Sequence, residues 1–176
     1  ALIRGTVADK NGNLTMDNES VIMEALPLAM AAKNSGGIVI AQAHYAAMSG
    51  ALLPKNVKVP GTLIDYVVIA KPENHHQTQQ TYFNPVLAGH FRVPLAGIPT
   101  ISLDARKIIG RRAALELKIG DVINLGVGIP AVIPSVIAEE GMTGKVTTTT
   151  ELGVFGGVPA IGLDFGGALN AEAMIE

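Results

Sequence analysis

Apolar residues along this chain alternate between helical and extended spacing. Helical spacing predicts helices, and these fall at residues 19–33, 105–118 and 131–140. Short apolar or β-branched runs predict strands, and these fall at residues 1–7, 38–41, 57–61, 66–70, 122–125 and 145–150. Because helices alternate with near-continuous apolar strands, the pattern predicts an α/β fold with open, mostly parallel sheets that carry helices on both faces.

One stretch, residues 71–99, shows neither spacing and is rich in Pro, Asn, Gln, Gly and His. A connection of this length is uncommon inside a compact domain. We therefore predict two domains, with residues 1–98 forming the first domain and its linker and residues 99–176 forming part of a second. The chain opens inside a β-rich run and stops at residues 171–176, which resemble the first turn of a helix, so we expect a fragment of a longer polypeptide.

Composition narrows the functional classes. Hydrophobic residues make up 48% of the 176 residues and charged residues only 16%, which excludes a disordered chain. The formal net charge is −2, so we expect no nucleic-acid partner. The absence of Cys excludes a disulfide framework and a thiolate metal site. Since no apolar run approaches the roughly 18 residues of a membrane span, we expect a cytoplasmic protein with no membrane partner.

Candidate chemistry follows two of the predicted strands. In open parallel sheets, ligands bind beyond the carboxyl ends of the strands, which here are followed by Gly126-Val127-Gly128 and by Glu151. The glycine loop can bring backbone amides close to an oxyanion, and the helix after it adds a favourable dipole, although a tight turn without a ligand is an alternative. Glu151 precedes an uncharged segment, 152–159, where a carboxylate calls for donors or chemistry, unless it simply faces solvent.

The same residues allow a second enzyme class. Gly126-x-Gly128-x-x-Ala131 after a strand, with Glu151 at the end of the next strand, is also a Rossmann pattern for a dinucleotide. Pro130 removes a backbone amide that a pyrophosphate normally uses, and no polar segment follows Glu151 to bind a ribose. An NAD-dependent oxidoreductase therefore stays as an alternative, as does a non-catalytic ligand-binding or interface module.

For five other polar positions, we expect no role in catalysis or metal binding. His75 and His76 lie in a polar stretch without metal-ligand spacing, which predicts a solvated loop. His44 follows a predicted strand, where a lone histidine is usually structural. Asp164 and Glu172 lie in a second glycine-bearing stretch, and we expect neither to be catalytic.

Three stretches carry a resemblance to a known family. With residues 2–13, 34–42 and 109–130, the sequence resembles the family I coenzyme A transferases, of the single-chain type that acts on short-chain acyl-CoA, acetate or 3-oxoacids. The resemblance runs along essentially the whole chain. It implies that the chain contains parts of two similar α/β domains, which lie in the interior of a longer enzyme of short-chain fatty acid or ketone body metabolism.

The resemblance also implies the site and the reaction. Glu151 matches the family's nucleophilic glutamate. For the reaction that this match implies, we expect the oxyanion or CoA to be bound by Gly126, Val127, Gly128, Gly156 and Gly157. The implied reaction is a ping-pong exchange through a glutamyl-CoA thioester, which needs no metal or redox cofactor because the CoA thioester is itself the substrate. Leu152 stands where many two-subunit relatives have Asn. The implied partners are acyl-CoA, short-chain carboxylates and further copies of the same chain.

Overall fold

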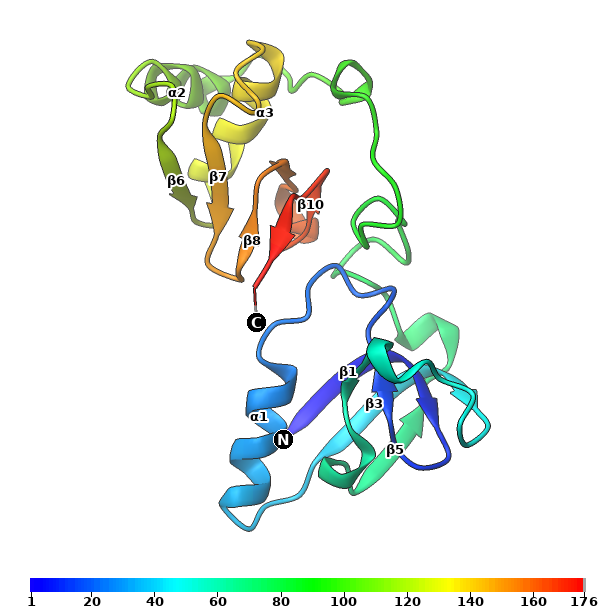
Figure 1. The fold of residues 1–176 in the computed structure, drawn as a ribbon. Helices are drawn as coiled ribbons and strands as arrows, with labels where there is room; N and C mark the ends of the chain where they lie inside the picture. Colours follow the sequence, from blue (N-terminus) through cyan, green and yellow to red (C-terminus); the bar gives the residue numbers. More distant parts are fainter. Residues whose placement is uncertain (176) are drawn as a thin grey trace. The chain divides into compact units, whose positions relative to one another are not determined.

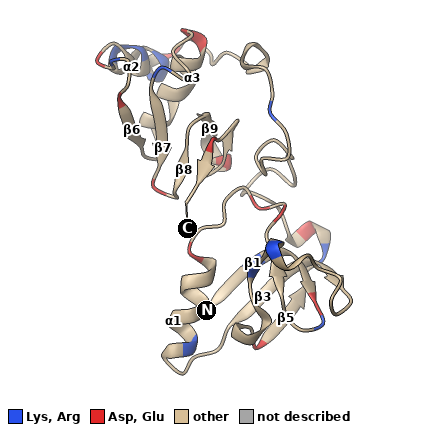
Figure 2. Ribbon diagram, viewed as in Figure 1, with Lys and Arg blue, Asp and Glu red and all other residues tan. Residues whose placement is uncertain are grey.

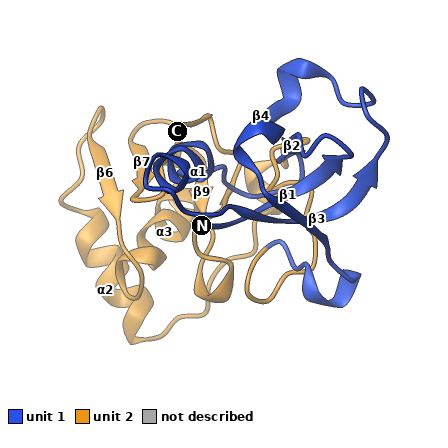
Figure 3. Ribbon diagram, turned by 90° about the horizontal axis from the view of Figure 1, so that it is seen from below, with its two compact units in different colours: residues 1–77 blue, residues 78–176 orange. Residues whose placement is uncertain are grey.

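The computed structural model describes residues 1–175, and the chain forms two compact units, residues 1–77 (unit 1) and residues 78–176 (unit 2) (Figure 3). Each unit has its own sheet. Within residues 1–175, no helix combines the length and the apolar character needed to cross a membrane.

Unit 1 is a five-stranded sheet in the order β4-β2-β1-β3-β5, together with one α-helix (Figure 1). Strands β1, β3 and β5 pair in parallel. On the other side of β1, β2 pairs antiparallel with β1, and β4 pairs antiparallel with β2. The elements are β1 (Leu2–Asp9), β2 (Leu14–Thr15), α1 (Ala25–Asn34), β3 (Ile40–Ala47), β4 (Val57–Val59) and β5 (Tyr66–Ile69), with 3-10 turns η1 (Pro54–Asn56), η2 (Gly61–Leu63) and η3 (Pro72–Asn74). Its core contains fully buried Leu14, Ala29, Val39 and Val59.

Unit 2 has a four-stranded sheet in the order β11-β8-β7-β6 and a separate pair of strands, β9 and β10. Strands β6 and β7 are parallel, whereas β8 runs antiparallel to both β7 and β11. The strands are β6 (Val122–Leu125), β7 (Thr147–Thr150), β8 (Val154–Phe155), β9 (Val158–Pro159), β10 (Ala168–Leu169) and β11 (Ala173–Met174). The helices are α2 (Ala105–Ala114) and α3 (Ile133–Glu139), with 3-10 turns η4 (Leu95–Gly97), η5 (Pro130–Val132) and η6 (Gly162–Asp164).

Helix α2 is fixed to α3 by charge and by close packing. Lys107 Nζ lies 2.6 Å from Glu139 Oε2, and its hydrogen bond holds the pKa of the Glu139 carboxyl below its usual value. Gly110 lets α2 approach the turn that leads into α3 closely, because a Cβ at this position would lie 2.7 Å from Val132 Cγ2 of η5. The position of α2 relative to α3 is therefore fixed by both an ion pair and close packing.

The predicted fold class is confirmed: both units are α/β with open sheets. Residues 122–125 form β6, and Asp104 caps α2 by accepting a hydrogen bond from Lys107 N at 2.9 Å. The sheets are less parallel than predicted, because each also contains antiparallel strand pairs. These involve β2 and β4 in unit 1 and β8 and β11 in unit 2. The first helix begins at Ala25 instead of residue 19. The expected helix start after residue 171 is wrong, because Ala173–Met174 pair with β8 as a strand.

Residues 78–98, which the sequence places with the first domain and its linker, make their hydrogen bonds inside unit 2. Thr78 Oγ1 donates to Asp164, while Val93 and Asn170 exchange two hydrogen bonds of 2.9 and 2.8 Å. The division between the compact units falls after Gln77, and the domain boundary at 98/99 stays a prediction.

Candidate active site

Glu151 lies on the turn that joins β7 to β8. Gly153 N donates to Thr150 O at 3.1 Å, so residues 150–153 form a tight hydrogen-bonded turn with Glu151 in its first corner. Gly153 has φ +81°, and a Cβ on it would lie 2.6 Å from Ile175 O. The Glu151 side chain is exposed, and Figure 2 shows an acidic residue on this turn. The turn thus presents a carboxylate on a backbone with little freedom.

The parallel pairing of β6 and β7 brings the two candidate segments to one edge of the sheet. Leu125 lies opposite Thr150 in the strand register. The next residues, Gly126 and Glu151, therefore leave the sheet from the same end, where ligands bind in sheets of this kind. The strand pairing on which the predicted site depends is present.

The glycine loop after β6 has few internal restraints. Val127 is 70% exposed and Gly128 has φ +99°, a left-handed conformation that favours glycine. In the part of the chain that the structure describes, the amides of Gly126, Val127 and Gly128 donate to no other backbone carbonyl. These amides are free to donate to a ligand.

The helix after the loop differs from the one expected. A 3-10 turn occupies Pro130–Val132, and the α-helix starts only at Ile133 and has 7 residues. The helix is therefore short, and its N-terminus is separated from the glycine loop by the 3-10 turn. The backbone amides of the loop itself are the stronger candidates for binding an oxyanion.

A cavity of about 570 Å³ lies against this loop within unit 2. Val127 and Gly128 form part of its wall, and Arg106 of α2 and Phe165 face it from other segments. Arg106 Nη2 donates a 2.9 Å hydrogen bond to Gly128 O. Sequence reasoning did not single out Arg106, because the contact joins residues 22 positions apart and no local pattern signals it.

The predicted CoA-binding positions Gly156 and Gly157 have a structural requirement of their own. Both adopt positive φ, +74° and +71°. A Cβ on Gly156 would lie 2.6 Å from the side chain of Glu172, and one on Gly157 would lie 2.2 Å from Leu169 O. The turn from β8 to β9 needs glycine at both positions whether or not CoA binds there, and the CoA-binding role stays a prediction.

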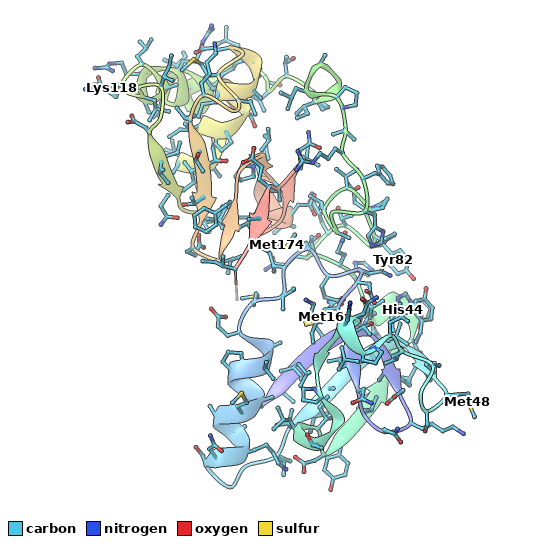
Figure 4. The ribbon with its side chains drawn as sticks, in the orientation of Figure 1. Met16, His44, Met48, Tyr82, Lys118 and Met174 are labelled. Carbon is cyan, nitrogen blue, oxygen red and sulfur yellow. The ribbon has the colours of Figure 1, made fainter. Side chains whose placement is uncertain are left out.

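Three of the remaining polar candidates, His75, His44 and Asp164, make contacts within the fold. His75 is 4% exposed, so the expectation of a solvated loop is wrong at this residue. His44, labelled in Figure 4, lies within β3 instead of after it. It stacks on Tyr45, with ring centroids 4.1 Å apart. Asp164 accepts from Thr78 and Gln80; burial raises its pKa, but these hydrogen bonds outweigh burial and lower the pKa overall. Asp164 therefore anchors the segment that contains Thr78 and Gln80.

Sequence and fold match one class of enzyme along the whole chain. No family model matches the sequence, but its homologues are CoA-transferases. The chain is 52% identical over 177 residues to a caffeate CoA-transferase of Acetobacterium woodii and covers 34% of that protein. It is 35% identical over 176 residues to the acetate CoA-transferase YdiF of Escherichia coli strain K12 and covers 33% of it.

The structure agrees with these sequence comparisons. A crystal structure of the acyl-CoA transferase YdiF from E. coli O157:H7, described as a thioester complex with CoA, superposes with a TM-score of 0.83 and 34% identity. All of this chain and 33% of YdiF are covered. The chain spans about a third of the length of the curated relatives that it matches.

Proposed function

We propose that the polypeptide that carries this chain transfers coenzyme A between acyl-CoA and free carboxylic acids, with Glu151 as the nucleophile. The observation that carries the proposal is the combination of full-chain similarity to CoA-transferases with an exposed carboxylate on a rigid turn at the carboxyl edge of a parallel strand pair. The crystallised relative that forms a thioester complex with CoA supports a covalent route.

The proposed reaction has two half-reactions through the same residue. The Glu151 carboxylate attacks the thioester carbonyl of acyl-CoA, the C–S bond breaks, and an acyl-glutamyl anhydride and the CoA thiolate result. The thiolate then attacks the glutamyl carbonyl, which releases the acyl group as a carboxylate and leaves CoA on Glu151 as a thioester. An incoming carboxylate reverses both steps. No electron is transferred, and the energy of the thioester is retained on the enzyme.

The protein must stabilise the oxyanions that form during each attack. The free amides of the glycine loop, Gly126 to Gly128, lie at the same sheet edge as Glu151 and are the donors that we assign to this work. Water must also be excluded from the glutamyl thioester. The uncharged residues that follow Glu151, from Leu152 to Pro159, supply an apolar neighbourhood suited to that requirement.

Two classes of acid are candidates for the exchange. Short-chain acids such as acetate are our first choice, in line with the acetate CoA-transferase relative. A hydroxycinnamic acid is the second, because the relative at 52% identity is named for caffeate. The acceptor profile of the enzyme, measured with acetate and caffeate side by side, decides between them.

The decisive test of the function is adduct formation without an acceptor. The native polypeptide is incubated with acetyl-CoA or caffeoyl-CoA in the absence of free carboxylate, and its intact mass is measured. We expect a stable gain equal to one CoA minus water. An NAD(H)-dependent absorbance change without the adduct would favour the oxidoreductase alternative, and neither signal would favour a non-catalytic module.

A further inference from the structure

Arg106 connects the glycine loop to a rigid part of unit 2. It lies in the first turn of α2, and its Nη2 donates to Gly128 O at 2.9 Å. Figure 2 shows that basic residues gather along this helix. Arg111 and Arg112 point to acidic partners, Glu140 and Glu116, whereas Arg106 is bonded to the loop backbone.

The helix that holds Arg106 is well anchored at this end. Asp104 caps it, and Lys107 Nζ both pairs with Glu139 at 2.6 Å and donates to Ile101 O at 2.8 Å. Gly110 packs closely against Val132. The Arg106 backbone is therefore a fixed point from which the guanidinium can hold a mobile partner in place.

The glycine loop, residues 126–128, is not anchored in this way. Its three amides donate to no other backbone carbonyl within residues 1–175, and a Cβ on Gly126 or Gly128 would meet no atom within 4 Å. A loop without packing around it or hydrogen bonds from its own amides can rotate its peptide planes readily. The Arg106 contact is what opposes that rotation at Gly128.

We propose that Arg106 is a positioning residue that holds the glycine loop in the conformation in which its amides stabilise the oxyanion formed at Glu151. This inference rests on the proposed function. In a trans peptide, the carbonyl and the following amide lie in one plane and point in opposite directions, so fixing Gly128 O also fixes the orientation of the Ile129 amide. The contact therefore anchors the loop at its Gly128 end. Electrostatic stabilisation of a transition state depends on donors that are already oriented before the reaction.

The test compares two arginines of the same helix in the native polypeptide. Arg106→Met keeps the length of the side chain but removes its donors, and Arg112→Met makes the same change where the side chain pairs only with exposed Glu116. For Arg106→Met we expect kcat to fall about ten-fold, as for the loss of one charge-assisted hydrogen bond, with KM within two-fold and thermal unfolding unchanged. Arg106→Lys, which keeps one donor, should recover part of kcat.

Each other outcome overturns the inference. A wild-type kcat for Arg106→Met, or an equal loss for Arg112→Met, shows that the Gly128 contact has no special role. A rise in KM at constant kcat shows that Arg106 binds substrate directly. If the wild-type protein itself gains no CoA mass, the proposed function fails and this inference fails with it. If the wild-type protein forms the adduct and only the variant result is negative, the function stands and the positioning role alone is rejected.

Discussion

Glutamates in the two units have opposite surroundings. In unit 1, Glu19 is buried, accepts from Thr6 Oγ1 and Arg4 Nε, and lies 3.6 Å from His75 Nε2. In unit 2, Glu151 is exposed, and the described structure gives it no hydrogen-bond or ion-pair partner. A carboxylate whose oxygens are occupied by protein donors stabilises the fold. A carboxylate held on a rigid turn with unoccupied oxygens is available to react.

Removing the Glu151 charge should give the largest effect. Glu151→Gln keeps the size of the side chain but replaces the nucleophilic carboxylate with an amide, so we expect turnover to fall by about 10³ or more. Glu151→Asp should also fail, since a shift of about 1 Å is enough to misplace a reacting group. Glu140→Gln, at the residue that follows α3, is the matched control and should keep wild-type turnover. If Glu151→Gln kept more than a tenth of the wild-type turnover, Glu151 would be no nucleophile.

A side chain in the glycine loop should have the next largest effect. Gly128→Val forces the loop out of its positive φ and displaces its donors, which we expect to lower kcat per folded molecule by about 10²–10³. Gly120→Val is a close control, because Gly120 also has a positive φ, +92°, and an added Cβ there meets no atom within 4 Å. Gly120→Val should strain the backbone about as much as Gly128→Val does, but it should leave turnover unchanged. Equal kcat losses in both variants would contradict a role for the loop in catalysis.

Removing the buried carboxylate of unit 1 should change stability instead of chemistry. Glu19→Ala leaves Thr6 and Arg4 without their shared acceptor and removes the carboxylate 3.6 Å from His75 Nε2. We expect a loss of about 2 kcal/mol in the free energy of unfolding, reduced by the partial exposure of Arg4. Hydrogen exchange of the β1 amides measures this loss in unit 1 alone. Glu24→Ala is the control, because Glu24 is exposed and its side chain does not cap α1. Unchanged exchange in Glu19→Ala would show that the cluster contributes nothing.

The smallest effect should be a pH dependence of the stability of unit 1, which arises from His75 beside Glu19. Gln42 Nε2 donates to Asn74 O, so its contact with His75 Nδ1 places the imidazole proton on Nε2. Burial and the Arg4 charge lower the pKa of His75 below 6.5, against the opposing influence of Glu19. The unfolded chain then binds the proton more readily, so stability should fall as pH drops below about 6.5 and recover above it. His75→Gln should flatten this dependence of β1 exchange; an unchanged slope would contradict it.

Local patterns in the sequence were enough for the parts of the fold that depend on neighbouring residues. The Asp104 cap and the strand 122–125 can both be predicted from short motifs. The parallel pairing that brings Gly126 and Glu151 to one edge also followed, because helix and strand alternate there.

Pairing and burial between distant residues account for what the sequence did not predict. Residues 19–24 have helical spacing but are not helical, since Glu19 is committed to Thr6 and Arg4 of β1. Residues 173–174 become a strand because β8 offers them a partner. His75 is buried by contacts with residues more than 30 positions away. The Arg106 contact to Gly128 has the same origin.

The central claim is that Glu151 carries CoA during the reaction, and mapping the adduct tests it most directly. The native polypeptide is charged with acyl-CoA without an acceptor, digested under mildly acidic conditions and analysed by tandem mass spectrometry. We predict a gain of one CoA minus water on the peptide that contains Glu151, localised to that side chain, and its absence in Glu151→Gln. CoA found on any other residue, or on Glu151→Gln protein in equal yield, would contradict the claim.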